Sequence, residues 1–374
     1  MNILQVTGMN RPTKFGGFEK WLVALCDRAA EEGHKVYIAY SECADCVQPY
    51  SECVNAAHCE LVVIENDKKL EAFCTEHLIK IVHFHFGFDC YKPVYRHLHQ
   101  EKIALFAHLH CENYFYKNTA WKHNPAKYMR IMAHRLKTFY TAKFFKQIFA
   151  SSEMVRKEYQ SLYFWSSTKL SVLYLGISEY VPNKTHENSI PVIACIAFHS
   201  PIKGVDTLLC ALKILMERKI PFHLIQMGGG STELHGEDTQ ALKDVCHSLL
   251  LDGHVSWTGV TNNVQRYLEQ ADIYCQPSRT ESLPLSIAEA MQCQLPIVAC
   301  NVGGVPELVH NGTNGYLVQP ENPEALASAL EGLLCNRALR ETMGNASKNV
   351  LKDLSFSITE SINKLWEYYK PWIS

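Results

Sequence analysis

The sequence lacks any apolar run that approaches the roughly twenty residues needed by a membrane-spanning helix. It also lacks an excess of charge of either sign, since 36 basic residues stand against 38 acidic ones. Nothing in that balance points to a nucleic-acid partner. No signal peptide precedes Met1–Val6, which already has the composition of a strand. We therefore expect a cytoplasmic protein that does not bind nucleic acid.

Motifs for metal binding and covalent catalysis are also scarce. No Asp-x-Asp pair lies at a plausible strand end, and the nearest acidic feature, Glu237–Asp238, falls in a loop after a glycine run. No residue stands out as a covalent nucleophile. We therefore predict no metal site, and a function that requires no cofactor.

Cysteine, in contrast, is abundant, with 15 residues. Several lie in apolar runs, as reduced and buried thiols do: Cys195, Cys275 and Cys300. Four others lie near His58, namely Cys43, Cys46, Cys53 and Cys59. The first two have Cys-x-x-Cys spacing, which could hold zinc, but the second two do not. An ordinary loop explains the cluster as well as a zinc site does.

At 374 residues the chain is too long for one typical core, so two domains are expected. Apolar strand-like runs alternate with helical segments, which favours an α/β class with parallel sheets. The polar, turn-rich stretch 182–188 is the predicted linker. We predict a first domain over 1–180, a second over 187–355 and a terminal helix over 356–374.

The most informative stretch is 278–318. A buried strand is predicted just before it, and Pro284 suits the first turn of a helix that continues through Ser286–Met291. Glu281 then lies in the strand-to-helix loop and Glu289 about one turn inside the helix. The unpaired N–H groups between them, on Leu283, Leu285 and Ser286, favour anions, phosphate above all. A nucleotide-sugar, with hydroxyls at both ends and phosphate between, suits such a site, although ordinary helix-dipole chemistry explains the helix alone.

A second strand, glycine turn and helix start follow at 296–307, including Gly303–Gly304. The whole tract resembles the C-terminal half of the GT-B, family-4-type retaining glycosyltransferases. Their E-x7-E signature matches Glu281 and Glu289, and VGGVPELV with NGxxGYLV is their usual continuation. The likeness runs for about forty residues without a gap.

The resemblance implies two Rossmann-like, doubly wound parallel-sheet domains facing a cleft, with Trp366 and Tyr369 of the terminal helix packing on the first domain. It implies that Glu289 holds the donor's ribose hydroxyls, Glu281 the sugar hydroxyls and Lys203, in a Lys-Gly turn, the diphosphate. The other predicted donor-binding residues are Gly16, Gly17, Gly228, Gly229, Thr258, Gly259, Ser282, Leu283, Pro284 and Leu285. Plain strand-to-helix turns explain the glycine positions as well.

The chain departs from the family pattern at one place. Family members carry an arginine five residues before the lysine, where this chain has Phe198. Either Lys203 neutralises the diphosphate largely alone or another cation substitutes, and Arg279 is the candidate.

Two His-x-His pairs stand at the ends of the predicted strands 79–84 and 103–107, namely His83 with His85 and His108 with His110. Functional groups gather at the carboxyl ends of parallel strands, although a single histidine there is more often structural. The resembled enzymes place a histidine after this fifth strand, near the transferred sugar. The best match is His110, and His108 is the alternative.

Residues 117–157 hold ten Lys or Arg and a single acid, Glu153, among many aromatics. A basic, aromatic-rich helix can lie on an anionic membrane surface. That interpretation would place the protein peripherally at the inner face of the plasma membrane, with a lipid-linked acceptor. A solvated helix face with core aromatics explains the same pattern.

The resemblance, on the residues that carry it, implies transfer of a hexose-type sugar from a UDP- or GDP-sugar to an acceptor hydroxyl of a saccharide or lipid-linked acceptor. The reaction would retain the anomeric configuration and serve cell-surface polysaccharide or glycolipid synthesis, with His110, Lys203 and Glu281 as catalytic residues. Three alternatives remain: a sugar-phosphate-type donor, a nucleotide-sugar epimerase or hydrolase, and a non-catalytic binding or scaffold protein.

Overall fold

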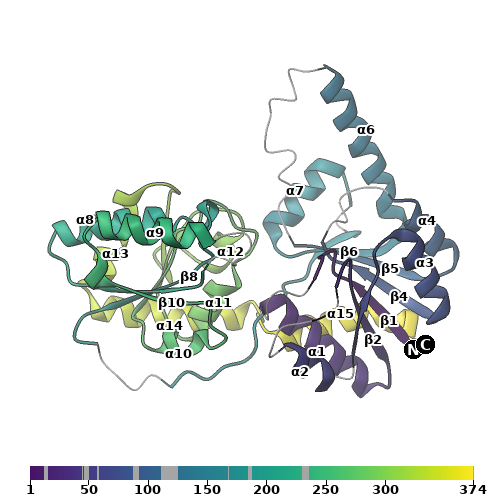
Figure 1. The fold of residues 1–374 in the computed structure, drawn as a ribbon, viewed down its shortest axis with the longest axis horizontal. Coiled ribbons are helices and arrows are strands. Elements are labelled where there is room, and N and C mark those ends of the chain that lie inside the picture. The colour runs from purple at the N-terminus through teal and green to yellow at the C-terminus, as the bar shows by residue number, and fades with distance from the viewer. Residues whose placement is uncertain are drawn as a thin grey trace. The chain divides into compact units, whose positions relative to one another are not determined.

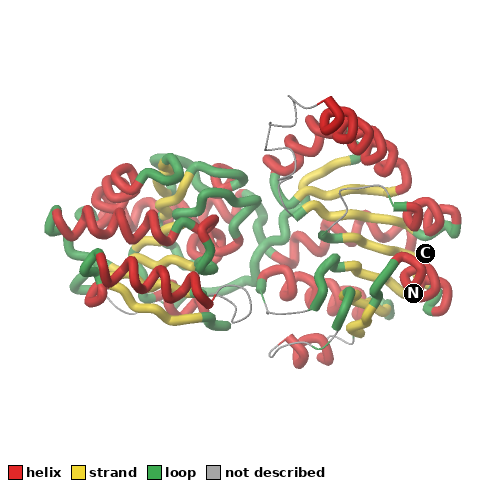
Figure 2. Tube along the Cα trace, turned by 45° about the horizontal axis from the view of Figure 1, so that its top comes forward, coloured by secondary structure: helices red, strands yellow, loops and turns green. Residues whose placement is uncertain are grey.

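The computed structural model describes residues 1–11, 16–43, 45, 50–56, 59–86, 92–110, 125–166, 168–183, 188–229 and 236–373. The chain divides into two compact units (Figure 1). Unit 1 comprises residues 1–178 and 357–374, and unit 2 comprises residues 179–356. In each unit the strands lie between layers of helices (Figure 2).

Unit 1 is built on a seven-stranded parallel sheet with the order β3-β2-β1-β4-β5-β6-β7. The strands are β1 (Asn2–Val6), β2 (Lys35–Tyr40), β3 (Glu60–Val63), β4 (Ile79–Phe84), β5 (Ala104–Leu109), β6 (Phe145–Ala150) and β7 (Leu170–Val172). The strand order reverses its direction between β1 and β4. In an open parallel sheet, ligands bind at the carboxyl ends of the two strands at such a switch point.

The helices of unit 1 are α1 (Gly17–Glu31), α2 (Tyr50–Ala56), α3 (Asp67–Glu76), α4 (Pro93–Gln100), α6 (Pro125–Thr141), α7 (Glu153–Tyr163) and α15 (Ile358–Ile373). Side chains of α3, α4 and α7 share one apolar core with Leu4, Val82 and Leu105 from the sheet. The alternate positions of the same strands point to the opposite face. That face carries α1 and α15.

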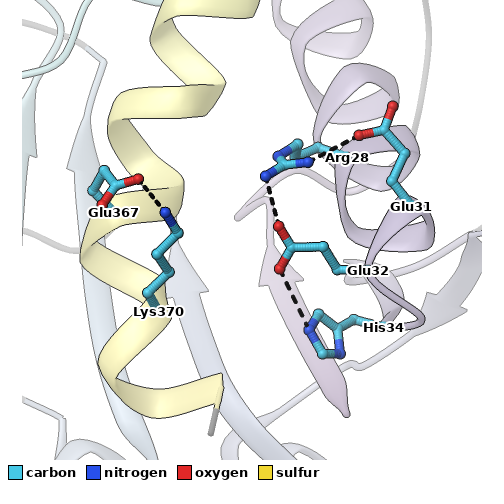
Figure 3. Close-up of polar contacts among 6 residues, drawn as sticks. All are labelled: Arg28, Glu31, Glu32, His34, Glu367 and Lys370. Carbon is cyan, nitrogen blue, oxygen red and sulfur yellow. Dashed lines mark hydrogen bonds and ion pairs between the residues drawn. The ribbon is translucent and has the colours of Figure 1, made fainter.

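The terminal helix α15 packs directly on α1. Trp366 and Tyr369, which the sequence predicts to pack on the first domain, lie fully buried in unit 1. Arg28 of α1 lies 5.6 Å from the centroid of the Trp366 ring, within cation–π range. Figure 3 shows the same guanidinium ion-paired with Glu31 at 2.9 Å and Glu32 at 2.6 Å, which holds it in place.

Unit 2 is built on a six-stranded parallel sheet with the order β10-β9-β8-β11-β12-β13. Its strands are β8 (Val192–Ile196), β9 (His223–Met227), β10 (Val255–Gly259), β11 (Ile273–Gln276), β12 (Ile297–Cys300) and β13 (Gly315–Val318). Its helices are α8 (Val205–Glu217), α9 (Gly236–Ser248), α10 (Val264–Glu269), α11 (Leu285–Gln292), α12 (Val305–Leu308), α13 (Pro323–Leu334) and α14 (Arg337–Asp353). Helices α8, α9 and α13 cover one face, and α10, α11 and α14 cover the other (Figure 1). The switch point lies between β8 and β11.

Two parallel-sheet α/β units confirm the predicted fold class, but some element boundaries were predicted wrongly. Helices α13 and α14 are separate because the Asn336 side chain caps the second by accepting from the N–H of Leu339. Pro284 precedes α11 as its N-cap instead of lying in its first turn. Strand β5 continues to Leu109, so His108 belongs to the strand and not to the loop after it.

Candidate functional site

In unit 2, the polar site residues lie on the two loops that leave the switch-point strands. Lys203 lies on the loop after β8, and Glu281 lies on the loop after β11. The lysine Nζ donates to Oε1 of Glu281 at 2.7 Å. Side chains 78 residues apart in sequence therefore form one ion pair where a ligand is expected.

Three donors converge on a single oxygen of Glu281. Besides Lys203, the Ser278 hydroxyl donates to Oε1 at 2.7 Å and the Gln276 Nε2 at 3.0 Å. The glutamate side chain is only 9% exposed, so these bonds offset the loss of its hydration. Among the described residues, none donates to Oε2. The carboxylate is thus fixed through one oxygen and has acceptor capacity on the other.

Gln276, which the sequence analysis assigned no role, orients this carboxylate. Its Oε1 accepts from the Tyr274 hydroxyl at 2.6 Å and from Ser286 at 3.1 Å, so its amide nitrogen faces Ser278 and Glu281. Burial raises the pKa of Tyr274, which therefore stays a neutral donor. A polar residue at the end of an otherwise apolar strand was the available sequence signal.

The position of Lys203 depends on the glycine that follows it. Gly204 has φ +65°, and a Cβ there would lie 2.1 Å from the carbonyl oxygen of Pro277. Only glycine allows this turn and this close approach of the two loops. The Lys-Gly pair predicted from sequence therefore works through both residues: the glycine brings the loop close, and the lysine reaches across it.

Arg279, the predicted substitute for the cation missing at Phe198, has other partners. Its guanidinium forms a bidentate pair with Asp206 at 2.8 and 2.7 Å and a further pair with Glu321 at 2.9 Å. The arginine holds the pKa of Asp206 below its usual range. Two carboxylates thus offset its charge, and Arg279 joins the β11 loop to α8. Its role as the cation for the diphosphate stays a prediction.

The start of α11 carries the other predicted donor contacts. With Pro284 at the N-cap, Leu285 and Ser286 are the first helical residues, whose N–H groups have no intrahelical acceptor. The carbonyl of Ser282 accepts from the N–H of Gly304 at 3.0 Å, which ties this loop to the next glycine turn. Leu283 precedes the cap, and Glu289 lies partly buried in the second turn of α11.

The glycine turns after β9 and β10 meet each other. The Gly228 N–H donates to the Gly259 carbonyl at 2.9 Å, and a Cβ at Gly228 would lie 2.1 Å from the Ala197 carbonyl oxygen. Gly229 follows directly. The Thr258 side chain helps to line a cavity of about 360 Å³ that includes neither Lys203 nor Glu281.

In unit 1, four histidines stand on one face of β4 and at the end of β5. We call them the histidine ladder: His83, His85, His108 and His110. The rings stack along each strand, with centroids 4.5 Å apart for His83 and His85 and 4.3 Å apart for His108 and His110. The first three side chains are buried, and His110 is partly exposed at the carboxyl end.

Burial dominates the electrostatics of the ladder. It lowers the pKa of His108 to about 3, with the backbone of Leu173 acting weakly the other way. Burial and the neighbouring imidazoles hold the pKa of His83, His85 and His110 well below the usual range. The ladder is therefore uncharged at neutral pH.

Gly16 and Gly17 directly precede Phe18, whose ring contacts the histidine ladder. Gly16 is the N-cap of α1 and Gly17 its first residue, and the ring of Phe18 lies 5.1 Å from that of His110. The buried Glu19 accepts from the Gly16 N–H at 2.8 Å. The α1 start thus already carries a carboxylate, so it attracts a phosphate less than α11 does.

The cysteine cluster that was weighed as a zinc site against an ordinary loop is not assembled among the residues that the structure describes. Cys43, Cys53 and Cys59 do not gather into a group of three metal ligands, while Cys46 and His58 lie outside the described ranges. The one such group within those ranges is the histidine trio His83, His85 and His108. None of the described helices combines the length and apolar character needed to cross a bilayer.

The paired Rossmann-like units and the polar switch-point loops define a protein of the GT-B glycosyltransferase class. The sequence model of the family "Glycosyl transferases group 1" matches residues 178–350, and that of "Glycosyltransferase Family 4" matches residues 15–179. The chain belongs to this family of group 1, family 4 glycosyltransferases.

Solved structures share the fold over the whole chain. A glycosyltransferase from Rickettsia africae is 18% identical with a TM-score of 0.78, covering 100% of this chain and 98% of that one. The Anabaena protein HepE in complex with UDP is 17% identical with a TM-score of 0.76, covering 99% of this chain and 100% of that one.

Curated relatives match over shorter stretches. A glycosyltransferase of Haemophilus influenzae is 34% identical over 166 residues, 44% of each chain. A GDP-mannose-dependent alpha-(1-6)-phosphatidylinositol monomannoside mannosyltransferase of Mycobacterium tuberculosis is 29% identical over 167 residues, 42% of each chain. The matched stretch thus spans less than half the length of these relatives.

Proposed function

We propose that this protein is a retaining glycosyltransferase that moves a hexose-type sugar from a UDP- or GDP-sugar to an acceptor hydroxyl. The observation that carries the proposal is the Lys203–Glu281 pair at the unit 2 switch point, fixed by Gln276 and Ser278. It presents a cation and a carboxylate oxygen side by side, as a sugar diphosphate requires.

Lys203 acts on the leaving group. Negative charge develops on the diphosphate as the bond to the sugar breaks, and a preorganised cation stabilises that charge without reorganisation. The lysine side chain is 22% exposed, so its charge is only partly screened by water. The first N–H groups of α11 add further donors.

Glu281 binds the sugar, and Glu289 binds the nucleoside. Because Oε1 of Glu281 already accepts three bonds, Oε2 is the atom that accepts from the sugar hydroxyls. Glu289 accepts from the ribose hydroxyls. Holding the donor at both ends leaves the anomeric carbon as its reacting part.

His110 positions the transferred sugar. The proposal uses no covalent nucleophile: the acceptor attacks from the same face as the departing diphosphate, which takes the acceptor's proton. His110 lies at the partly exposed end of the ladder, where its ring can contact a ligand. The ring is held by a hydrogen bond between its Nε2 and the Nδ1 of His85, which lie 3.0 Å apart.

The test is thermal-shift binding of UDP-, GDP- and ADP-sugars to wild type and to Glu289→Ala. We expect one nucleotide class to raise the melting temperature of the wild type, since a ligand that binds only the native state stabilises it. The shift should shrink in the variant. Product analysis by NMR then reports the anomeric configuration.

The alternatives give different results in the same assays. Binding without turnover on any acceptor would indicate a scaffold protein, and turnover without acceptor an epimerase or hydrolase. Binding of sugar phosphates but not of nucleotide-sugars would indicate an enzyme that uses a sugar-phosphate-type donor. No shift with any donor would contradict the proposal.

We also propose that α6 meets an anionic membrane carrying a lipid-linked acceptor, which would serve cell-surface polysaccharide or glycolipid synthesis. Helix α6 exposes large apolar side chains, including Met129 at 66%, Leu136 at 59% and Tyr140 at 53%. Basic residues such as Arg130 and Lys137 lie on the same helix.

Co-sedimentation with vesicles containing phosphatidylglycerol should fall for the double variant Met129→Glu with Leu136→Glu. It should stay unchanged for Leu250→Glu, which alters an exposed leucine of unit 2. Equal binding by both variants would contradict this part of the proposal.

A further inference from the structure

The histidine ladder leaves buried nitrogen atoms without hydrogen-bond partners. Both ring nitrogens of His108 and the Nε2 of His83 are buried and make no hydrogen bond of ordinary length and angle with any described residue, although the Leu173 backbone lies near enough to His108 to act on its pKa. A buried polar atom left unpaired destabilises the folded state, because it loses its bonds to water and gains none in return. Three such atoms in one cluster call for a ligand that imidazole nitrogens recognise.

Protonation does not supply that ligand. The rings of His83 and His108 are fully buried, and burial favours their neutral form. A neutral imidazole carries one lone pair on a ring nitrogen, which is the form that binds transition metals. The cluster is thus kept in its metal-binding state at neutral pH.

Outer contacts fix the orientation of two rings. The Nδ1 of His83 lies 2.6 Å from the Tyr369 hydroxyl, so an Nδ1–H that donates to this oxygen leaves the lone pair on Nε2. The Nε2 of His85 lies 2.9 Å from the side-chain oxygen Oε1 of Gln5, which can only accept, so this nitrogen carries the proton. The other nitrogen, Nδ1, then accepts from the Nε2–H of His110 at 3.0 Å, and a bound metal would replace this hydrogen bond. Metal-ligating histidines commonly donate their second N–H to such an acceptor.

We propose that His83, His85 and His108 form a binding site for a divalent transition metal ion of the zinc and cobalt type. One ligand nitrogen from each of the three lies within 4.8 Å of the others. Zinc bound to histidine at about 2.0–2.1 Å brings such atoms to about 3.3 Å of one another in a tetrahedral site. Small rotations of the rings about χ2, a soft torsion, close the difference.

The site supplies three protein ligands and leaves one position for a water or hydroxide, as three-histidine zinc sites do. Sulfur does not take part, since no cysteine belongs to the group. The metal would join β4 to β5 and, through Tyr369, to α15. The inference does not rest on the proposed glycosyl transfer, because its ligands differ from the residues assigned to the donor.

The test uses the full chain, freed of any affinity tag and treated with a chelator. After addition of Zn²⁺ and dialysis, elemental analysis should find about one ion per chain. Zn²⁺ should raise the melting temperature by mass action. The Co²⁺ form should show a visible d–d spectrum, and X-ray absorption should show nitrogen neighbours at about 2.0–2.1 Å without a sulfur shell near about 2.3 Å.

Two variants separate metal binding from folding. His108→Leu removes the two unpaired nitrogens, so its metal-free form should melt at or above the wild-type temperature. It should, however, neither retain Zn²⁺ nor gain stability from it. Tyr369→Phe removes only the outer acceptor and should weaken Zn²⁺ binding roughly 10–100-fold. Cys53→Ser is the matched control and should bind like wild type.

Three results would overturn the proposal. One is a wild type that retains no ion and melts at the same temperature with and without Zn²⁺, as it would if a buried water paired with the nitrogens. Another is a sulfur shell in the absorption spectrum. The third is undiminished binding by both His108→Leu and Tyr369→Phe.

Discussion

The two units place opposite electrostatics on the same topology. At the unit 2 switch point, Lys203 and Glu281 form an ion pair in which each is the other's partner. Near the unit 1 switch point, the histidines have no carboxylate among their described hydrogen-bond partners, and burial removes their charge instead. The comparison shows that a switch point fixes where polar side chains gather, while their partners decide whether they stay charged. Unit 2 should therefore respond to changes of charge and unit 1 to changes of pH.

The largest effect should come from removing Lys203, the cation at the unit 2 switch point. Lys203→Ala should lower kcat/KM for the nucleotide-sugar by about 10²–10³, as loss of one preorganised stabilising group does in other sites. Steady-state kinetics measures this. Lys213→Ala, which removes a lysine paired with Glu217 on the surface of α8, should change it by less than about twofold. A loss below about tenfold for Lys203→Ala would show that the diphosphate is stabilised elsewhere.

The next largest effect should come from the turn that delivers Lys203. Gly204→Ala forces a side chain into a left-handed position and against the Pro277 carbonyl, so it should destabilise unit 2 by about 1–3 kcal/mol and weaken donor binding. Urea denaturation and thermal shift measure the two losses. Gly332→Ala, inside α13 with open space around it, should instead stabilise by about 0.5–1 kcal/mol. Equal effects of the two substitutions would contradict the close approach of the loops.

Acid should act on unit 1. Burial lowers the pKa of His108 to about 3, below the unfolded value of about 6.5. Between these two pKa values, the unfolded chain binds a proton at His108 and the folded chain does not. Stability from the neutral ring is present above about pH 6.5 and is lost toward about pH 3, at up to about 1.4 kcal/mol per pH unit.

The measurement is urea denaturation of the metal-free protein at several pH values between about 7 and about 5. His108→Leu should reduce the slope. Phe149→Leu, a buried neighbour on the same sheet face, should lower stability at every pH and leave the slope unchanged. A wild-type slope equal to that of His108→Leu would mean that His108 does not become protonated on unfolding in this range.

The smallest effect should follow from Arg279→Lys. Lysine cannot reproduce the bidentate pair with Asp206, but that carboxylate is 46% exposed and Glu321 is 67% exposed. Water already weakens both pairs, so the loss of stability should stay below about 1 kcal/mol, with activity nearly unchanged. Calorimetry and kinetics measure these quantities. A loss of activity as large as that of Lys203→Ala would return Arg279 to the role of diphosphate cation.

Much of the fold could be predicted from sequence because local rules coincide in it. Apolar runs of strand length recur between helical segments, and Gly204 marks a tight turn. One boundary was predicted wrongly: the strand predicted over 103–107 continues to Leu109, so His108 belongs to β5. The sequence could not show that Asp206 and Glu321 pair with Arg279, because they lie 73 and 42 residues away from it.

By itself, the sequence determined the two-domain α/β architecture and the family, and it predicted Glu281 and Glu289 as site residues of the second domain. These depend on local patterns and on a motif of fixed spacing. Only the tertiary structure decided that Gln276 orients Glu281 and that Lys203 pairs with Glu281. It also decided that His83 lies beside both His108 and Tyr369. Those contacts join positions from 5 to 286 residues apart in the sequence. Sheet order and burial bring such positions together, and local sequence patterns do not reveal them.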